Sequence, residues 1–126
     1  NARYLFQKFI NFDKEFRLLV LGNTIGIIHT KTVRDNTGFK LGYQSMDEFP
    51  EFLDIPDVSK VIKDTAIKAA KVLRIQIAGV DICRERETGR VFVFEVNRGP
   101  GIDYDTEVSQ ELKKMAEFFK NQLKIK

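Results

Sequence analysis

Three oxygen-bearing side chains, Asp81, Glu95 and Asn97, lie in two apolar segments that are predicted to be neighbouring β-strands. Two carboxylates and an amide oxygen are hard ligands, the kind that hold magnesium together with substrate phosphates. Carboxylates flanked by apolar residues are costly to bury alone, and a bound cation removes that cost. The pattern therefore predicts a metal site. The open alternative is that the two acids are simply solvated on the exposed face of a hairpin.

Strand alternation predicts how these side chains meet. Successive side chains point to opposite faces, so Asp81 shares a face with Cys83, and Glu95 shares one with Asn97. We expect the bulky apolar residues of both strands to face the helices; these are Val80, Ile82, Phe92, Phe94 and Val96. An antiparallel register that allows this, for example Ile82 opposite Phe94, sets Asp81 opposite Glu95. Their Cβ atoms would be about 4.5 to 5.5 Å apart, close enough for one ion to bridge them.

Seven elements are predicted to carry these groups. Residues 4–10, 15–21 and 24–33 are predicted strands, the last two joined by a tight turn at Gly22-Asn23. Residues 34–50 are predicted to be a long loop, and a helix is predicted from Asp54 to Leu73. Strands at 75–83 and 91–97 follow, and a last helix starts at about Thr106. The order β-β-β-α-β-β-α predicts an α+β fold, an antiparallel β-sheet with helices on one face.

Composition narrows the class of protein. A chain of 126 residues, 43% hydrophobic and 31% charged, predicts one soluble, cytoplasmic domain without a membrane span. One cysteine, Cys83, and one histidine, His29, exclude a zinc site of soft ligands. We expect Cys83 to serve packing and His29 to be a structural or surface residue. The net charge of +3 comes from intermixed acids and bases, which is weak evidence for nucleic-acid binding. The start at Asn1 is expected to mark a fragment of a longer chain.

Three motifs carry a resemblance to a known family. The segments 78–82 (Ala-Gly-Val-Asp-Ile), 94–97 (Phe-Glu-Val-Asn) and 99–101 (Gly-Pro-Gly) resemble the C-terminal signature of ATP-grasp ligases. They are most similar to the glutathione synthetase and ribosomal-protein glutamate ligase (RimK-like) branch. The resemblance implies that residues 1–126 form the C-terminal subdomain of an ATP-grasp domain. It also implies that Asp81, Glu95 and Asn97 bind the magnesium (or manganese) ions that accompany ATP.

The resemblance extends to the predicted first strand. Gln7, Lys8, Phe9 and Ile10 are similar to the hinge strand of the family, whose backbone binds adenine and whose apolar side chains sandwich the ring. An ordinary buried strand is the alternative.

Further candidate contacts follow from the same resemblance. Glu15 and Arg17 resemble an Asp-x-Arg element, with Glu in place of Asp, in which the acid lies near the ribose and the arginine reaches phosphate or acyl phosphate. Arg17 is thus the catalytic candidate, and a surface ion pair is the alternative. Lys31 and Phe94 are further candidates for nucleotide contact.

Two departures from the family pattern are visible. The loop after Lys31 usually carries an arginine-serine-asparagine cluster near the phosphates, but residues 36–42 read Asn-Thr-Gly-Phe-Lys-Leu-Gly. Lys31, Arg34 and Lys40 are possible substitutes, although ordinary solvated charges would look the same. The N-terminal half of the ATP-grasp domain is also missing, so the chain alone is expected to be inactive.

The function implied is that of an ATP-dependent ligase. Similar enzymes convert a carboxylate to an acyl phosphate, which an amine or thiol then attacks, and the substrate can be a peptide or protein. A rival interpretation is a degenerate ATP-grasp half that binds nucleotide or a partner without chemistry. A third is a small basic nucleic-acid-binding domain, which would show strongly salt-dependent affinity.

Overall fold

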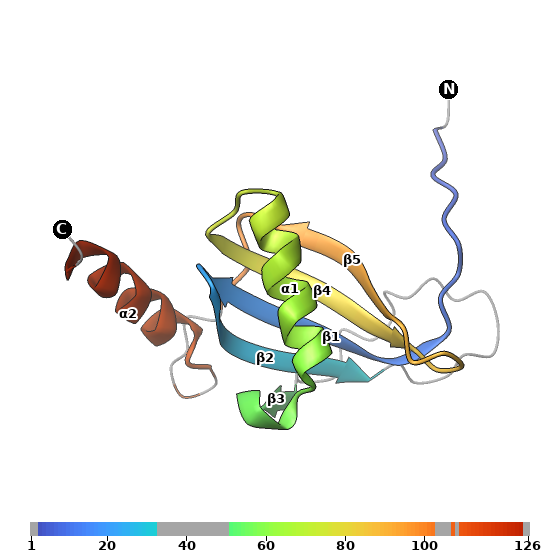
Figure 1. The fold of residues 1–126 in the computed structure, drawn as a ribbon, viewed down its shortest axis with the longest axis horizontal. Coiled ribbons are helices and arrows are strands. Elements are labelled where there is room, and N and C mark those ends of the chain that lie inside the picture. Colours follow the sequence, from blue (N-terminus) through green and yellow to red (C-terminus); the bar gives the residue numbers. More distant parts are fainter. Residues whose placement is uncertain (1–2, 33–50, 103–106, 108, 125–126) are drawn as a thin grey trace.

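The computed structural model describes residues 3–32, 51–102, 107 and 109–124, and its centre is an antiparallel sheet (Figure 1). Its five strands are β1 (Phe12–Leu21), β2 (Thr24–Thr32), β3 (Glu51–Leu53), β4 (Ile77–Glu85) and β5 (Val91–Asn97), in the order β3-β2-β1-β4-β5. A 3₁₀ turn, η1 (Ile55–Asp57), precedes helix α1 (Lys60–Val72), and helix α2 (Glu111–Lys124) ends the described chain. The predicted α+β class with an antiparallel sheet is confirmed.

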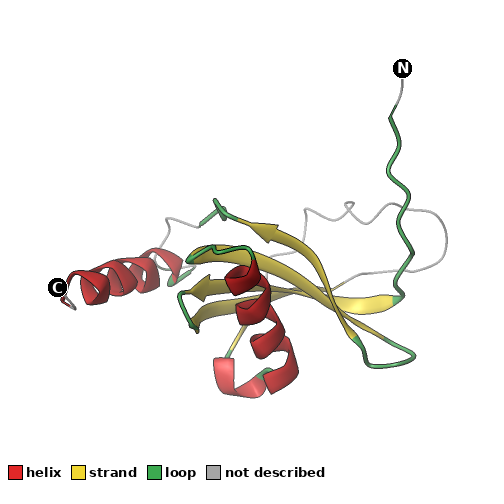
Figure 2. Cartoon of the chain, turned by 45° about the horizontal axis from the view of Figure 1, so that its top comes forward, coloured by secondary structure: helices red, strands yellow, loops and turns green. Residues whose placement is uncertain are grey.

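Helix α1 covers one face of the sheet and forms the core with it (Figure 2). Ile62, Ala66 and Ala70 recur every four residues, which places them on one side of the helix, and all three are buried. They pack against strand residues of the same face, namely Leu18, Val20, Ile28, Ala78, Val80 and Ile82. The two alanines let the helix backbone approach the sheet closely, so this face is closed to solvent.

Helix α2 takes a different position from the one predicted. It lies at the end of the sheet beside the β1–β2 hairpin, where the Phe118 ring reaches Gly22 (Figure 1). Its first residue, Glu111, lies next to Leu19 and Ile27, which point away from the α1 face. Only α1 therefore covers the face that both helices were expected to cover, because the first turn of α2 packs on the opposite side.

The predicted strand at residues 4–10 is wrong. Residues 3–11 form no regular secondary structure and lead away from the sheet (Figure 1). Leu5 and Phe6 are 82% and 91% exposed, so these two apolar side chains find no cover within the described residues. A strand needs a neighbour for its backbone groups, and the first such pairing begins at Phe12, opposite Glu85.

Strand β3 was not predicted from the sequence. It takes the place of the predicted strand at residues 4–10 in the number of strands. β3 has only three residues, which is too short for an alternating pattern to be recognised, and it pairs with β2 from Ile28 to Thr30. The predicted loop at 34–50 lies outside the described residues up to its end, where β3 begins. Among the described residues no helix is long and apolar enough to cross a lipid bilayer.

The predicted turn at Gly22-Asn23 is confirmed. Gly22 has φ +63° and Asn23 is not in the positive-φ region, the combination found in type II′ hairpin turns. The Thr24 hydroxyl donates a hydrogen bond to the Leu21 carbonyl at 2.9 Å, which closes the turn.

We expect Gly22→Ala to destabilise the protein more than Gly89→Ala. Both glycines have positive φ (+63° and +69°), so an alanine side chain is strained at either site by about 1 to 2 kcal/mol. At Gly22 the new Cβ would also lie 3.3 Å from the Phe118 ring, whereas nothing lies within 4 Å of it at Gly89. Free energies of unfolding from urea titrations measure the difference. Equal losses in the two variants would contradict the packing of α2 on the hairpin.

Candidate functional site

A row of directly opposed side chains crosses all five strands on the sheet face that α1 leaves open. The strand pairings set Phe52 opposite His29, His29 opposite Arg17, Arg17 opposite Asp81, and Asp81 opposite Glu95. Opposed residues of antiparallel strands have Cβ atoms about 4.5 to 5.5 Å apart. The ladder thus places one cation, two acids and the single histidine of the chain side by side.

The predicted register of the two acidic strands is confirmed at the acids. Asp81 is the partner of Glu95, and Asn97 is the partner of Gly79, two residues further along β5. The Gly99 N–H donates a hydrogen bond to Asn97 Oδ1 at 3.0 Å, which fixes the amide at the end of the strand. Asp81, Glu95 and Asn97 therefore share one face.

Beyond the acids the predicted register is wrong. A β-bulge in β5 shifts the pairing so that Ile82 lies opposite Val93 and not Phe94. Val93 and Val96 consequently face α1, while Phe92 lies opposite Cys83 on the open face. A bulge inserts one unpaired residue and reverses the alternation beyond it, which hydrophobicity alone does not reveal.

The bulge residue Phe94 joins the open face. Its ring meets the Phe12 ring edge-on, with centroids 5.1 Å apart, and Phe12 lies opposite Glu85, which shares a face with Asp81. Phe94 is 45% exposed. The Phe12 and Phe94 rings thus lie beside the acids. Phe92 and Phe94 were expected to face the helices, but both lie on the open face.

Asp81 is held by an ion pair with the neighbouring strand. Arg17 Nε lies 3.5 Å from Asp81 Oδ1, and Asp81 is only 6% exposed. Because desolvating a carboxylate is costly, the adjacent guanidinium compensates part of that cost. Glu95, on the edge strand, is exposed. The Asp81 carboxylate is therefore fixed in position, whereas Glu95 can reach a ligand from solvent.

Gly79 lies where the 99–101 loop and the Arg17 side chain approach strand β4. A Cβ at Gly79 would lie 2.9 Å from Pro100 Cβ and 3.3 Å from Arg17 Nη2. The missing side chain therefore lets the 99–101 loop lie against β4 beside the guanidinium. Sequence analysis did not find this contact, although the glycine directly before Val80-Asp81 was a signal of close approach.

Cys83 and Glu15 are directly opposed beside the row, two residues from Asp81 and Arg17 on the same strands. Burial, together with the Glu15 and Glu85 carboxylates, raises the pKa of the Cys83 thiol to about 11. The thiol is thus neutral at physiological pH, in agreement with a packing role. Lys31 is the β2 partner of Glu15, and the structure does not describe its side chain.

The remaining sequence candidates are not brought to the row. Gln7, Lys8 and Phe9 are exposed on the N-terminal segment, and only Ile10 is buried. Arg34 and Lys40 lie outside the described residues.

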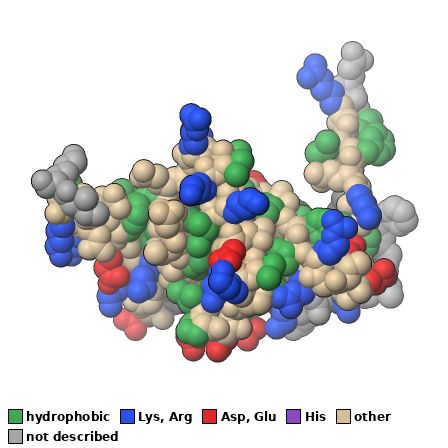
Figure 3. Space-filling model, viewed as in Figure 1, with side chains coloured by type: hydrophobic (Ala, Val, Ile, Leu, Met, Phe, Trp, Pro, Cys, Tyr) green, Lys and Arg blue, Asp and Glu red, His purple; other side chains and the backbone are tan. Residues whose placement is uncertain are grey.

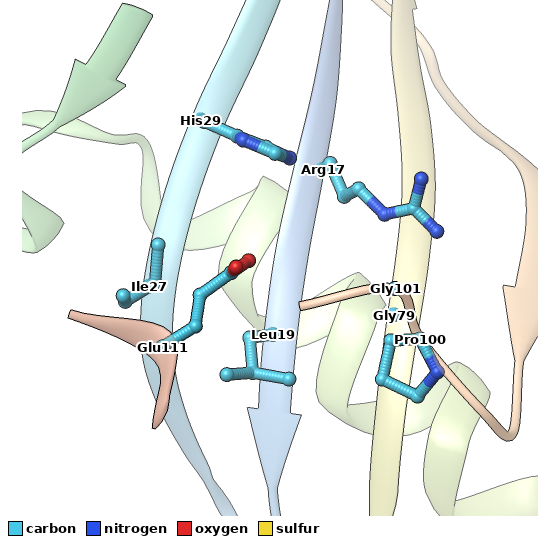
Figure 4. Close-up of a pocket in the computed structure, with 8 residues that line it drawn as sticks. All are labelled: Arg17, Leu19, Ile27, His29, Gly79, Pro100, Gly101 and Glu111. Carbon is cyan, nitrogen blue, oxygen red and sulfur yellow. The ribbon is translucent and has the colours of Figure 1, made fainter. Parts of the chain in front are cut away.

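Two residues, one in the row and one beside it, were not recognised as site residues from the sequence. His29 stands next to Arg17, and Glu111 is 8% exposed and points from α2 toward them (Figure 4). The signal for Glu111 was its spacing, because it falls three residues after Val108 and four before Met115, on the apolar side of the predicted helix.

The donor set suits a hard cation. Within the described ranges, no three His, Cys, Asp or Glu side chains cluster as a metal site. The candidate set instead has two carboxylates and the amide of Asn97, and magnesium in nucleotide sites commonly takes one or two carboxylates plus phosphate oxygens. The residues present therefore fit a magnesium ion that reaches the site with a nucleotide.

Solved structures with the same fold include an ATP-grasp ligase and a macrocyclase. The ATP-grasp ligase PsnB complexed with minimal precursor superimposes with a TM-score of 0.69 over 93% of this chain and 36% of its own, at 17% identity. PsnB complexed with a phosphomimetic variant of minimal precursor, Mg and ADP gives 0.57 over 80% and 28%, also at 17% identity. The macrocyclase MdnC bound with precursor peptide MdnA from Microcystis aeruginosa MRC gives 0.62 over 90% and 34%, at 16% identity.

Sequence comparison also finds a ligase. A probable alpha-L-glutamate ligase of Enterobacter sp. (strain 638) is 31% identical over 105 residues, which cover 82% of this chain and 33% of the relative. The chain thus spans about a third of the length of the proteins it matches. Residues 1–117 match the RimK-like ATP-grasp domain. With its fold and its Gly-Val-Asp and Glu-Val-Asn strands, this chain belongs to the RimK-like ATP-grasp family.

Proposed function

We propose that this chain is the metal-binding part of the ATP site in an ATP-dependent ligase that joins a carboxylate to an amine or thiol through an acyl phosphate. The observation that carries the proposal is the row in which Arg17, Asp81 and Glu95 lie directly opposite one another on three strands. The family assignment supplies the reaction class. The complete reaction belongs to a longer protein, because the matching ligases are about three times as long.

Asp81, Glu95 and Asn97 would hold magnesium (or manganese). When bound, the ion supplies positive charge that neutralises the β- and γ-phosphates of ATP. The protein's own part is to keep the three oxygens on one face. The strand pairing and the Gly99–Asn97 hydrogen bond serve that purpose.

Arg17 would hold the transferred phosphoryl group. Its side chain is 27% exposed, so part of the guanidinium reaches the open face while Nε faces Asp81. An arginine presents five donors in a planar fork, so it can contact a carboxylate and a phosphate at once. Positive charge aimed at the developing phosphoryl charge is the main way in which such sites stabilise the transition state.

The base and ribose would lie toward the aromatic end of the open face. Phe94 and Phe12 offer partly exposed rings there, and Glu15 follows on β1. The exposed apolar segment that contains Gln7, Lys8 and Phe9, followed by Ile10, would complete this wall in the longer protein, as the hinge of an ATP-grasp domain does. Lys31 would contribute charge from the end of β2.

The proposed substrates follow from the names of the relatives. The curated relative is a probable alpha-L-glutamate ligase, and the solved neighbours hold precursor peptides. We therefore infer an amino acid, with L-glutamate as the first candidate, as the amine, and a peptide or protein as the carboxylate. A cytoplasmic location, where ATP is available, goes with this proposal.

We expect Asp81→Asn and Glu95→Gln in the full-length protein to lower ATP-dependent ligation at least about 100-fold, because each removes charge that holds the metal and the phosphates. ADP release, measured with MgATP, L-glutamate and a peptide carboxylate, reports the loss. Asp64→Asn is the matched control, because Asp64 is exposed and pairs with Lys60 on α1. An unchanged melting temperature shows that the fold is intact. Full activity in either site variant would contradict the assignment of that residue.

We expect Gly79→Ala to impair turnover by displacing two neighbours at once. Its Cβ would lie 2.9 Å from Pro100 and within 3.4 Å of the Arg17 guanidinium, so the 99–101 loop must move. A second variant, Gly99→Ala, is the control, because nothing lies within 4 Å of a Cβ built there. Turnover should fall about tenfold or more in the first variant. If both variants behave alike, the contact between Gly79 and Pro100 does not position Arg17.

A further inference from the structure

A shallow groove lies along α1 where the helix passes strand β5 (Figure 1). The strand residues beneath the middle of α1 are buried, but the β5 side chains on this side of the sheet stay partly exposed. β5 lines the groove with Val93 and Val96, and α1 lines it with the side that starts at Thr65 and ends at Leu73, directly after the helix. Its volume is about 360 Å³, within the range of about 300 to 1,000 Å³ that ligand sites occupy. The groove can therefore hold several side chains of a partner.

Most of the groove is apolar. Val72 and Leu73 are 71% and 51% exposed, and Val93 is 38% exposed. Thr65, Ala69 and Val72 follow one another at spacings of four and three residues, which places them on one side of α1. Single exposed apolar residues are ordinary on a protein surface, but apolar side chains of two elements that line one groove indicate a binding surface.

The shape of the groove suits a second helix beside α1. The stretch of α1 from Thr65 to Leu73 is about 12 Å long at about 1.5 Å per residue, which corresponds to about two turns of a partner helix. Helices packed side by side have their axes about 8 to 10 Å apart. A helix at that distance from α1, on the β5 side, would lie over Val93 and Val96. Amphipathic helices bind such grooves with their apolar side.

The charges around the groove indicate the chemistry of that helix. Lys68 lines the groove, and no acid does so among the described residues. Lys71 and Arg74 are exposed and directly adjoin Val72 and Leu73 in the chain. Figure 3 shows lysines and arginines beside apolar side chains on the side of the molecule where α1 lies. A complementary partner therefore carries carboxylates along its apolar side.

The one acid of α1 does not change this balance. Asp64 is paired with Lys60, in the first half of the helix. Lys68 and Lys71 have no ion-pair partner among the described residues, so both can meet carboxylates from outside.

We propose that this groove docks an acidic amphipathic helix of a partner protein, whose apolar side covers Val72, Leu73 and Val93 and whose carboxylates meet Lys68 and Lys71. The groove and the row lie on opposite sides of the sheet, so a docked helix leaves the row open. Docking requires neither metal nor ATP and thus goes beyond the proposed function.

Fluorescence anisotropy on the full-length protein, without nucleotide or metal, tests the proposal. The probe is a labelled alanine-based peptide of about 20 residues, long enough to be helical in water, with leucine along one side and glutamate on both flanks. A second probe carries lysine in place of each glutamate. We expect the glutamate probe to bind at least about tenfold more tightly than the lysine probe, and its affinity to fall as salt screens the lysines of the protein.

Two pairs of variants locate the binding surface. Lys68→Glu should weaken binding of the glutamate probe about tenfold or more, because it places like charges opposite one another. Lys120→Glu, at an exposed position of α2, is its matched control and should change the affinity less than about twofold. Val72→Ala should weaken binding about threefold or more through lost apolar contact. Val61→Ala is the control on the same helix, because Val61 is 60% exposed and does not line the groove. Unchanged melting temperatures show that the fold is intact.

Several outcomes would overturn the proposal. Equal affinity for the two probes would mean that charge does not select the partner. A wild type that binds neither probe would assign the groove to the rest of the longer protein. A wild type that self-associates in light scattering, and is monomeric as Lys68→Glu, would assign it to a second copy of the chain. Equal losses in Lys68→Glu and Lys120→Glu would place the probe elsewhere. The proposed function is tested separately, by the activity of Asp81→Asn and Glu95→Gln.

Discussion

The register between β1, β4 and β5 is the constraint on which the site depends. Arg17, Asp81 and Glu95 come from segments up to 78 residues apart in the chain, and only the pairing of the three strands sets them opposite one another. A shift of one residue in either ladder would turn a whole strand's side chains to the other face. The packed face prevents such a shift, because it would expose the apolar residues that α1 buries. The core beneath α1 thus fixes the geometry of the charged residues on the other side of the sheet.

The space-filling view shows how charge is distributed over one side of this small domain. On the side seen in Figure 3, lysines and arginines are scattered among apolar and acidic side chains without merging into one field. This agrees with the intermixed charge in the sequence and gives no support to the nucleic-acid interpretation, which would need a continuous basic surface. Specific charge pairing in the row, and not net charge, is what distinguishes the candidate site.

Local sequence patterns predicted most of the strands and helices. They did not predict the features that depend on which strands pair and in which register. Alternation located β1, β4 and β5 and set Asp81 opposite Glu95, because both strands keep their period up to the acids. The bulge at Phe94 broke that period and sent Phe92 and Phe94 to the open face, which composition could not reveal. Residues 4–10 have the composition of a strand but no described neighbour to pair with, and β3 has a neighbour but only three residues. The spacing of Glu111 indicated the apolar side of the last helix, but which part of the sheet that side meets depends on tertiary packing.

The charges of the row also indicate the order in which ligands can bind. With one cation, Arg17, and two anions, Asp81 and Glu95, the three central residues carry one net negative charge. A triphosphate that approaches them without a counterion meets like charge at short range, where the effective dielectric constant is well below that of water. A divalent cation reverses the sign and leaves the Arg17 guanidinium free to face the phosphates. Under the proposed function, nucleotide binding at this face would therefore be coupled to the metal by electrostatics.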